Sequence, residues 1–164
     1  MLLSLLAVPL LAASSASAPH AGADPVSAFE RFIVGSTEGS GTVDVIASGR
    51  HTVRDRTQGR KDASGALVLD QIVEEEGKPA RRRTWRLVRA DGNQITGTIN
   101  DVKGAVTGEL TGNTLHLRYR MKDGPSVKQW ITLQPGGRTA KNRMTYHRFG
   151  LKVATVETEM RRVE

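Results

Sequence analysis

The sequence contains no cysteine and few aromatic residues. Without cysteine, the chain has no disulfide framework, thiolate zinc site, CxxC redox centre or cysteine nucleophile, and no residue that could carry a bacterial lipid anchor. Aromatic residues make up 4% of the chain, and the sequence shows neither a groove-reading helix nor an aromatic-bearing recognition strand. These absences argue against disulfide-stapled, thiol-dependent and nucleic-acid-binding proteins.

A long apolar run is missing as well, so a membrane-spanning helix is not predicted. The first 23 residues contain no Asp, Glu, Lys or Arg, and residues 2–13 form an apolar run typical of a signal-peptide core. Of two A-x-A sites we favour cleavage after Ala23, because cleavage after Ala18 would leave Pro19 as the new N-terminus. We expect residues 1–23 to be a secretory signal. The alternative is a disordered Ala/Ser leader on a cytosolic protein.

Residues 24–164 are predicted to form one domain, which fits the length of the chain. They carry all the charged residues, 24 Lys and Arg against 17 Asp and Glu, which gives a formal net charge of +7. On an exported protein, such a surplus favours solubility or attraction to anionic surfaces. We expect anionic lipid head groups to be the electrostatic partner rather than nucleic acid.

The remaining sequence has the pattern of an antiparallel meander. Segments of roughly seven to ten residues are separated by turn chemistry rich in Gly, Asp, Asn and Pro, for example at residues 62–65, 91–93 and 122–125. Apolar side chains recur at every second position of residues 115–121, with basic residues between them. About nine or ten such strands are best accommodated by closure, since an open sheet would expose long edges.

We therefore predict an all-β, lipocalin-like up-and-down barrel, with a sandwich as the alternative. Asp24 and Pro25 have the character of a helix start, and Val26, Phe29 and Phe32 follow at helical spacing. We expect this short helix to cap one end of the barrel.

No catalytic or metal-binding pattern is recognisable. The four histidines show no H-x-H or H-E-x-x-H spacing, and no G-x-S-x-G motif is present. We predict no metal, no cofactor and no enzymatic activity. The alternative is a lipid-modifying enzyme that uses Asp101 or Tyr119 as an acid/base group.

Two polar features have more than one interpretation. Residues 81–89 contain five arginines. In one interpretation Trp85 and Leu87 belong to the core, and Arg82, Arg86 and their neighbours form a solvated strand face balanced by residues 74–76 across a hairpin. In the other, the run is an anionic-surface patch anchored by Trp85. Asp101 and Arg143, at predicted strand ends, either orient a ligand head group or close a buried polar network.

Four ordered blocks share a pattern with one protein family: residues 83–87 (RTWRL), 97–108 (GTINDVKGAVTG), 112–119 (GNTLHLRY) and 142–158 (NRMTYHRFGLKVATVET). They resemble the uncharacterised bacterial family named domain of unknown function 3833. The resemblance implies a lipocalin-like barrel, an exported location and a lipid-related role, with no established activity. Its members resemble envelope lipoproteins. Because this chain lacks the anchoring cysteine, we expect a soluble form in the periplasm or at the outer-envelope periphery.

Together these observations predict a barrel that binds a fatty acid, a lipid or another apolar small molecule in its interior. The side chains expected at the cavity or its polar end are Leu69, Trp85, Leu87, Ile99, Asp101, Leu117, Tyr119, Trp130, Arg143, Tyr146 and Phe149. The alternative is a filled barrel whose basic surface contacts anionic lipid or a protein partner. The oligomeric state stays open.

Overall fold

The computed structural model describes residues 24–163, and the predicted signal, residues 1–23, lies outside them. The chain begins with helix α1 (Pro25–Ile33). Ten strands follow in order: β1 (Gly35–Val45), β2 (Gly49–Lys61), β3 (Leu67–Glu75), β4 (Arg81–Arg89), β5 (Gln94–Ile99), β6 (Val102–Thr111), β7 (Thr114–Met121), β8 (Ser126–Leu133), β9 (Thr139–Arg148) and β10 (Leu151–Arg162).

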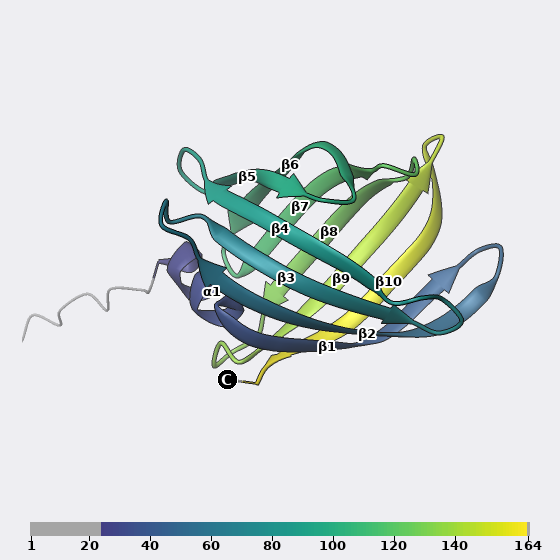
Figure 1. The fold of residues 1–164 in the computed structure, drawn as a ribbon, viewed down its shortest axis with the longest axis horizontal. Coiled ribbons are helices and arrows are strands. Elements are labelled where there is room, and N and C mark those ends of the chain that lie inside the picture. Colours follow the sequence, from purple (N-terminus) through teal and green to yellow (C-terminus); the bar gives the residue numbers. More distant parts are fainter. Residues whose placement is uncertain (1–23, 164) are drawn as a thin grey trace, which may run out of the picture.

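The strands form one closed antiparallel barrel. Each strand pairs with its neighbours in sequence, and β1 closes the barrel by pairing with β10 (Figure 1). Closure satisfies the backbone groups that an open sheet would leave at its edges. The prediction of an up-and-down barrel is confirmed, and the alternative of a sandwich is wrong.

The period of two in the sequence sets the inside and the outside of the barrel. In β7 the apolar residues Leu115, Leu117, Tyr119 and Met121 are all buried, and the positions between them are more exposed. The same alternation runs through β4 and β8. A continuous core therefore follows the inner wall of the barrel.

Helix α1 lies across one end of the barrel, as predicted (Figure 1). Asp24 caps it, with Oδ1 accepting a hydrogen bond from the backbone N–H of Val26 at 3.3 Å. Phe29 and Phe32 are buried against the barrel. At the other end of the helix, the Arg162 guanidinium donates to the carbonyl of Val34 at 2.6 Å. The helix thus closes one end of the barrel, which we call the helix end; the opposite end is the mouth.

One detail of the predicted charge pairing is wrong. In the β3–β4 register Val73 lies opposite Arg81, so residues 74–76 extend beyond the end of β4 and do not face its arginines. Glu74 instead pairs with Arg56 of β2 at 3.2 Å. The β3–β4 connection lies at the mouth end of the barrel, and Glu75 therefore lines the mouth.

Candidate functional site

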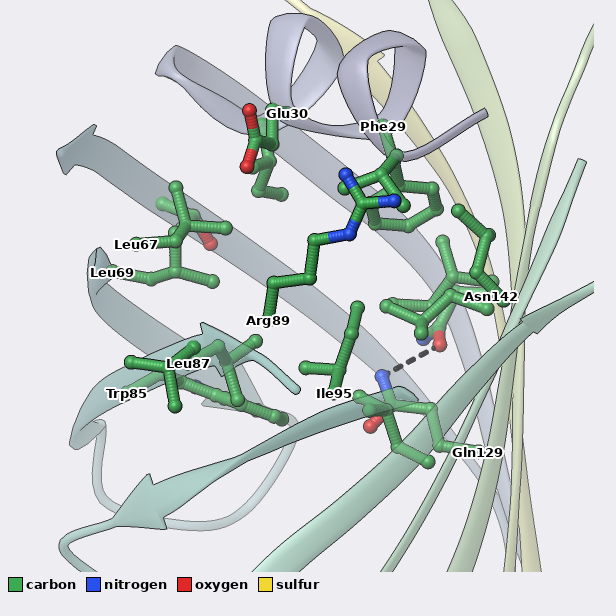
Figure 2. Close-up of a pocket in the computed structure, with 18 of the residues that line it drawn as sticks. Phe29, Glu30, Leu67, Leu69, Trp85, Leu87, Arg89, Ile95, Gln129 and Asn142 are labelled. Atoms are coloured by element: carbon green, nitrogen blue, oxygen red, sulfur yellow. Dashed lines mark hydrogen bonds between the residues drawn. The ribbon is translucent and has the colours of Figure 1, made fainter. Parts of the chain in front are cut away.

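An apolar cavity of about 110 Å³ lies beneath α1. The helix contributes Val26, Phe29 and Ile33 to its wall. The strands add mainly aliphatic side chains: Leu67, Leu69, Leu87, Ile95, Leu110, Leu115, Leu117, Ile131 and Met160. Figure 2 shows several of them with Arg89, which extends from β4 into the same region. The chemistry of this wall suits a hydrocarbon group.

A set of polar side chains, here called the polar belt, lies deeper in the barrel. It consists of Asp55, Gln71, Trp85, Gln129 and Asn142. The Trp85 indole donates to Gln71 Oε1 at 3.1 Å, and Gln71 Nε2 donates to Asp55 Oδ1 at 3.2 Å. On the other wall Gln129 Nε2 donates to Asn142 Oδ1 at 2.9 Å (Figure 2). The belt is therefore held in place by bonds among its own members.

Beyond the polar belt a second cavity, of about 360 Å³, leads to the mouth. Its wall mixes apolar residues such as Val53, Met144 and Val156 with charged groups that include Glu75 and Arg81. All five belt residues line this cavity as well as the one beneath α1. The two spaces therefore meet at the belt.

A buried ion pair stands beside the mouth cavity. Arg83 of β4 donates through Nε to Asp101 Oδ2 at 2.7 Å and through Nη2 to Oδ1 at 3.0 Å. The guanidinium carbon lies 4.8 Å from the centre of the Trp85 ring, which also packs edge-on against Tyr119. Both oxygens of Asp101 are thus occupied by Arg83, and this pair is part of the wall.

The second candidate acid/base group is equally engaged. Burial raises the pKa of the Tyr119 phenol, so the group stays protonated and donates to Gln129 Oε1 at 3.0 Å. A phenol in this state supports the belt rather than accepting a proton. Among residues 24–163, no three His, Asp or Glu side chains gather closely enough to hold a metal ion.

Asp55 is the acidic member of the belt. Its Oδ1 accepts from Gln71 and from the Thr57 hydroxyl, the latter at 3.4 Å. Its other oxygen lies over Gly39 of β1, where a Cβ atom would approach it to 2.2 Å. Burial raises the pKa of the carboxyl, although hydrogen bonds and the charge of Arg83 act in the opposite direction. A glycine at position 39 therefore provides the space for an inward-facing carboxyl.

The structure places several of the predicted residues in the interior. Leu69, Leu87 and Leu117 line the cavity beneath α1, Trp85 lines both cavities and Tyr146 lines the mouth cavity. Three further predicted residues lie in the wall: Ile99 and Tyr119 are buried, and Asp101 occupies the β5–β6 turn. Binding by these residues stays a prediction.

Three predicted cavity residues point away from the interior, and their placement was wrong. Trp130 faces outward and stacks on His116, with ring centres 4.7 Å apart, because the neighbouring Gln129 and Ile131 point inward. Arg143 is 58% exposed and pairs with Glu157 at 3.5 Å. Phe149 is fully exposed in the β9–β10 turn. For Trp130 and Arg143 the alternation of the strand decides the direction of the side chain, and for Phe149 its place in a turn does. Residue type did not predict these directions.

Most of the belt and the partner of Asp101 were not predicted from the sequence. Arg83 was not assigned to the interior, although it shares the phase of Trp85 and Leu87 and is 5% exposed. Gln71 and Gln129 likewise point to the same side of their strands as the buried apolar residues two positions away. A polar residue in the inward phase of an otherwise apolar strand was the signal that could have identified them.

Fold and site together define a closed antiparallel β-barrel with an apolar cavity under a helix and a polar belt at its centre. The model of the family described as "Protein of unknown function (DUF3833)" matches residues 8–162, nearly the whole chain, and the chain belongs to this family. The predicted family resemblance is confirmed.

Among solved structures the chain is similar to the S-type phycobiliprotein lyase CPES from Guillardia theta. The TM-score is 0.66 at 11% sequence identity, over 85% of this chain and 93% of that chain. At this identity the likeness concerns the fold. No curated protein matches the chain in sequence. No helix among residues 24–163 is long and apolar enough to cross a membrane.

Proposed function

We propose that this protein binds one elongated amphipathic molecule, a fatty acid or another lipid, inside the barrel of an exported protein of the bacterial envelope. The observation that carries the proposal is that two cavities of different polarity adjoin inside one barrel. An apolar cavity beneath α1 meets a mixed polar and apolar cavity at the mouth, and the polar belt lines both.

The size of the interior supports a ligand of this class. The mouth cavity of about 360 Å³ falls within the range of roughly 300–1,000 Å³ typical of small-molecule sites. Along β4 six residue steps separate Arg81 at the mouth from Leu87 beneath α1. This corresponds to roughly 20 Å at the usual strand rise, a length comparable to that of an extended long acyl chain.

The distribution of polarity suggests the orientation of the ligand. The apolar chain would lie beneath α1 against Leu69 and Leu117, where a hydrocarbon loses no hydrogen bonds. The head group would lie toward the mouth, where Arg81 is exposed and lines the cavity. An anionic head group next to Asp55 would meet an unfavourable charge, so we place it on the mouth side of the belt.

The similar solved structure gives general support only. The similar structure is a phycobiliprotein lyase, and a lyase has a substrate. A barrel of this architecture can therefore receive another molecule. The choice of a lipid rests on the cavity wall of this chain.

The proposal is tested by native mass spectrometry, followed by lipid extraction, on protein purified from a bacterial periplasm without detergent. We expect a near-stoichiometric adduct whose extracted component is a fatty acid or lipid. A fluorescent fatty acid titrated into delipidated protein supplies the affinity. Saturable binding and displacement by an unlabelled fatty acid are the expected results.

A matched pair of variants locates the site. Ile95→Gln puts an amide into the cavity beneath α1, whereas Ile72→Gln makes the same change at a half-buried residue on the outer face of β3. We expect the first to weaken binding of the fluorescent fatty acid roughly tenfold, in line with burial of an amide against hydrocarbon, and the second to leave it unchanged. A wild-type protein without an adduct and without saturable binding, or equal effects of the two variants, would contradict the proposal.

A further inference from the structure

Three large apolar side chains are exposed at the mouth end of the barrel. Within residues 24–163 the exposed large hydrophobic residues are Ile46, Phe149 and Leu151, which are 74%, 101% and 72% exposed. Ile46 lies in the β1–β2 turn, and the other two lie at the β9–β10 turn. These hairpins are neighbours, since the backbone N–H of Ile46 donates to the carbonyl of Val153 at 3.1 Å. We call these three residues the apolar tip.

Phe149 holds an unfavourable backbone conformation in this exposed position. Its φ is 49°. Among residues 24–163, every other residue with a positive φ is a glycine. With Gly150 at φ 78° it forms a two-residue hairpin turn of the kind that favours Asn-Gly or Gly-Gly. Neither the fold nor the turn benefits from a phenylalanine here. An exposed aromatic side chain at a strained turn therefore indicates a role outside the folded core.

Basic residues flank the β9–β10 part of the apolar tip. No acidic residue occurs between Met144 and Val156, whereas Arg148 and Lys152 flank the turn. Arg148 donates to the backbone carbonyl of Asp123, and Lys152 is exposed. On the neighbouring hairpin Arg50 is exposed as well, paired with Asp44 at 3.3 Å. The formal net charge of +7 adds a long-range attraction to anionic surfaces.

We propose that the apolar tip inserts into the interfacial region of an anionic lipid bilayer, so that the mouth of the barrel faces the membrane. Exposed aromatic and aliphatic side chains flanked by Arg and Lys are the composition that binds such interfaces. In Figure 1 both hairpins project at the end of the barrel opposite α1. Membrane contact of this kind involves the outer surface alone and is independent of what the interior binds.

The test is co-sedimentation of the protein with phosphatidylcholine vesicles that contain or lack phosphatidylglycerol. We expect binding to the anionic vesicles that weakens as salt is raised. Phe149→Asn removes the aromatic ring and introduces a residue that prefers this turn. It should lower the partition coefficient at least about fivefold, while the Tm stays equal to or above that of the wild type.

A second pair of variants distinguishes binding at the apolar tip from a general attraction caused by net charge. Lys152→Glu reverses a charge beside the apolar tip, and Lys141→Glu makes the same reversal at an exposed position of β9 near the helix end. The first should reduce vesicle binding several-fold more than the second, because the attraction of a charge to the surface falls off within a Debye length. In addition, the tryptophan fluorescence of Phe149→Trp should shift to the blue on binding and should be quenched by brominated lipid.

Three results would overturn the inference. One is the absence of wild-type binding to anionic vesicles. Another is equal loss for the two charge reversals, which would assign binding to net charge alone. The third is a Phe149-dependent dimer of the free protein in sedimentation velocity, which would assign the tip to a second copy of the chain.

Discussion

At the scale of single residues, Asp55 has an environment unlike that of a surface carboxylate. It faces inward from a strand whose neighbouring inward residues are Val53 and Thr57, and it belongs to the polar belt. Burial raises its pKa. The folded state therefore favours the protonated form more than the unfolded chain does, which makes the stability of the protein dependent on pH.

We expect Asp55→Asn to stabilise the protein at neutral pH. Since the pKa of Asp55 is higher in the folded state, its contribution to stability is greatest at acidic pH and falls as pH rises through the folded value. Asparagine stays neutral, and its carbonyl can accept the bonds from Thr57 and Gln71. The gain at pH 7 should be of the order of 1 kcal/mol and should shrink toward pH 4 in urea unfolding curves.

Asp70→Asn is the control with the opposite sign. Asp70 lies on the outer face, and a hydrogen bond from Arg60 lowers the pKa of its carboxyl. Its stabilisation is present above the unfolded value and is lost as the pH falls, so this variant should be less stable than wild type at neutral pH. A loss of stability at pH 7 in Asp55→Asn would contradict the assignment.

At the scale of elements, β4 contributes more to the interior than its composition suggests. One face of the strand carries Arg83, Trp85 and Leu87 inward, and Arg83 ties the strand to Asp101 in the β5–β6 turn. The ion pair fixes this turn beside the mouth. Its side chains are 6% and 27% exposed, so its loss would leave a largely buried guanidinium without a partner.

Asp101→Asn is therefore expected to destabilise the fold. Removal of one partner of a buried pair costs about 3–5 kcal/mol, and the partial exposure of Asp101 places the expected cost near the lower limit. Thermal unfolding should show a Tm lower by about 5–10 °C. Glu157→Gln, which breaks the exposed pair with Arg143, should change stability by less than about 1 kcal/mol. Equal effects of the two variants would refute a structural role for the Arg83–Asp101 pair.

The elements themselves were largely predictable from local sequence. Asp24 and Pro25 identified the start of α1, and the alternation in residues 115–121 gave the two faces of β7. Turn chemistry at the hairpins matches the positive φ of glycines such as Gly92 and Gly124. Errors arose where residue type was weighed above strand phase, as for Trp130 and Arg143.

At the scale of the whole molecule, the seam between β1 and β10 decides whether the sheet becomes a barrel. These strands come from opposite ends of the domain and pair over nine residues from Thr37 to Val45. Gly41 lies in this seam, where a Cβ atom would lie 1.9 Å from the carbonyl oxygen of Glu157. The seam therefore depends on a residue without a side chain.

We expect Gly41→Val to open or distort this seam. Its side chain meets backbone rather than a flexible side chain, so the cost should be about 3 kcal/mol or more. The variant should lose its near-UV circular dichroism signal at a lower urea concentration than the wild type, which would measure this destabilisation. Ser40→Val, on the exposed face of the same strand, should be close to neutral, since valine suits strands. A stable, wild-type-like Gly41→Val protein would contradict this account of closure.

The sequence by itself determined the antiparallel strands, their inward and outward faces, the capping helix and the family. These features follow from local periodicity, turn chemistry and ordered motifs, each contained in a short stretch of chain. Only the tertiary structure decided the contents of the interior. The polar belt joins residues of β2, β3, β4, β8 and β9, and Asp101 pairs with Arg83 rather than with a residue nearer in sequence. Such contacts depend on strand register and barrel closure, which bring together side chains that no local pattern connects.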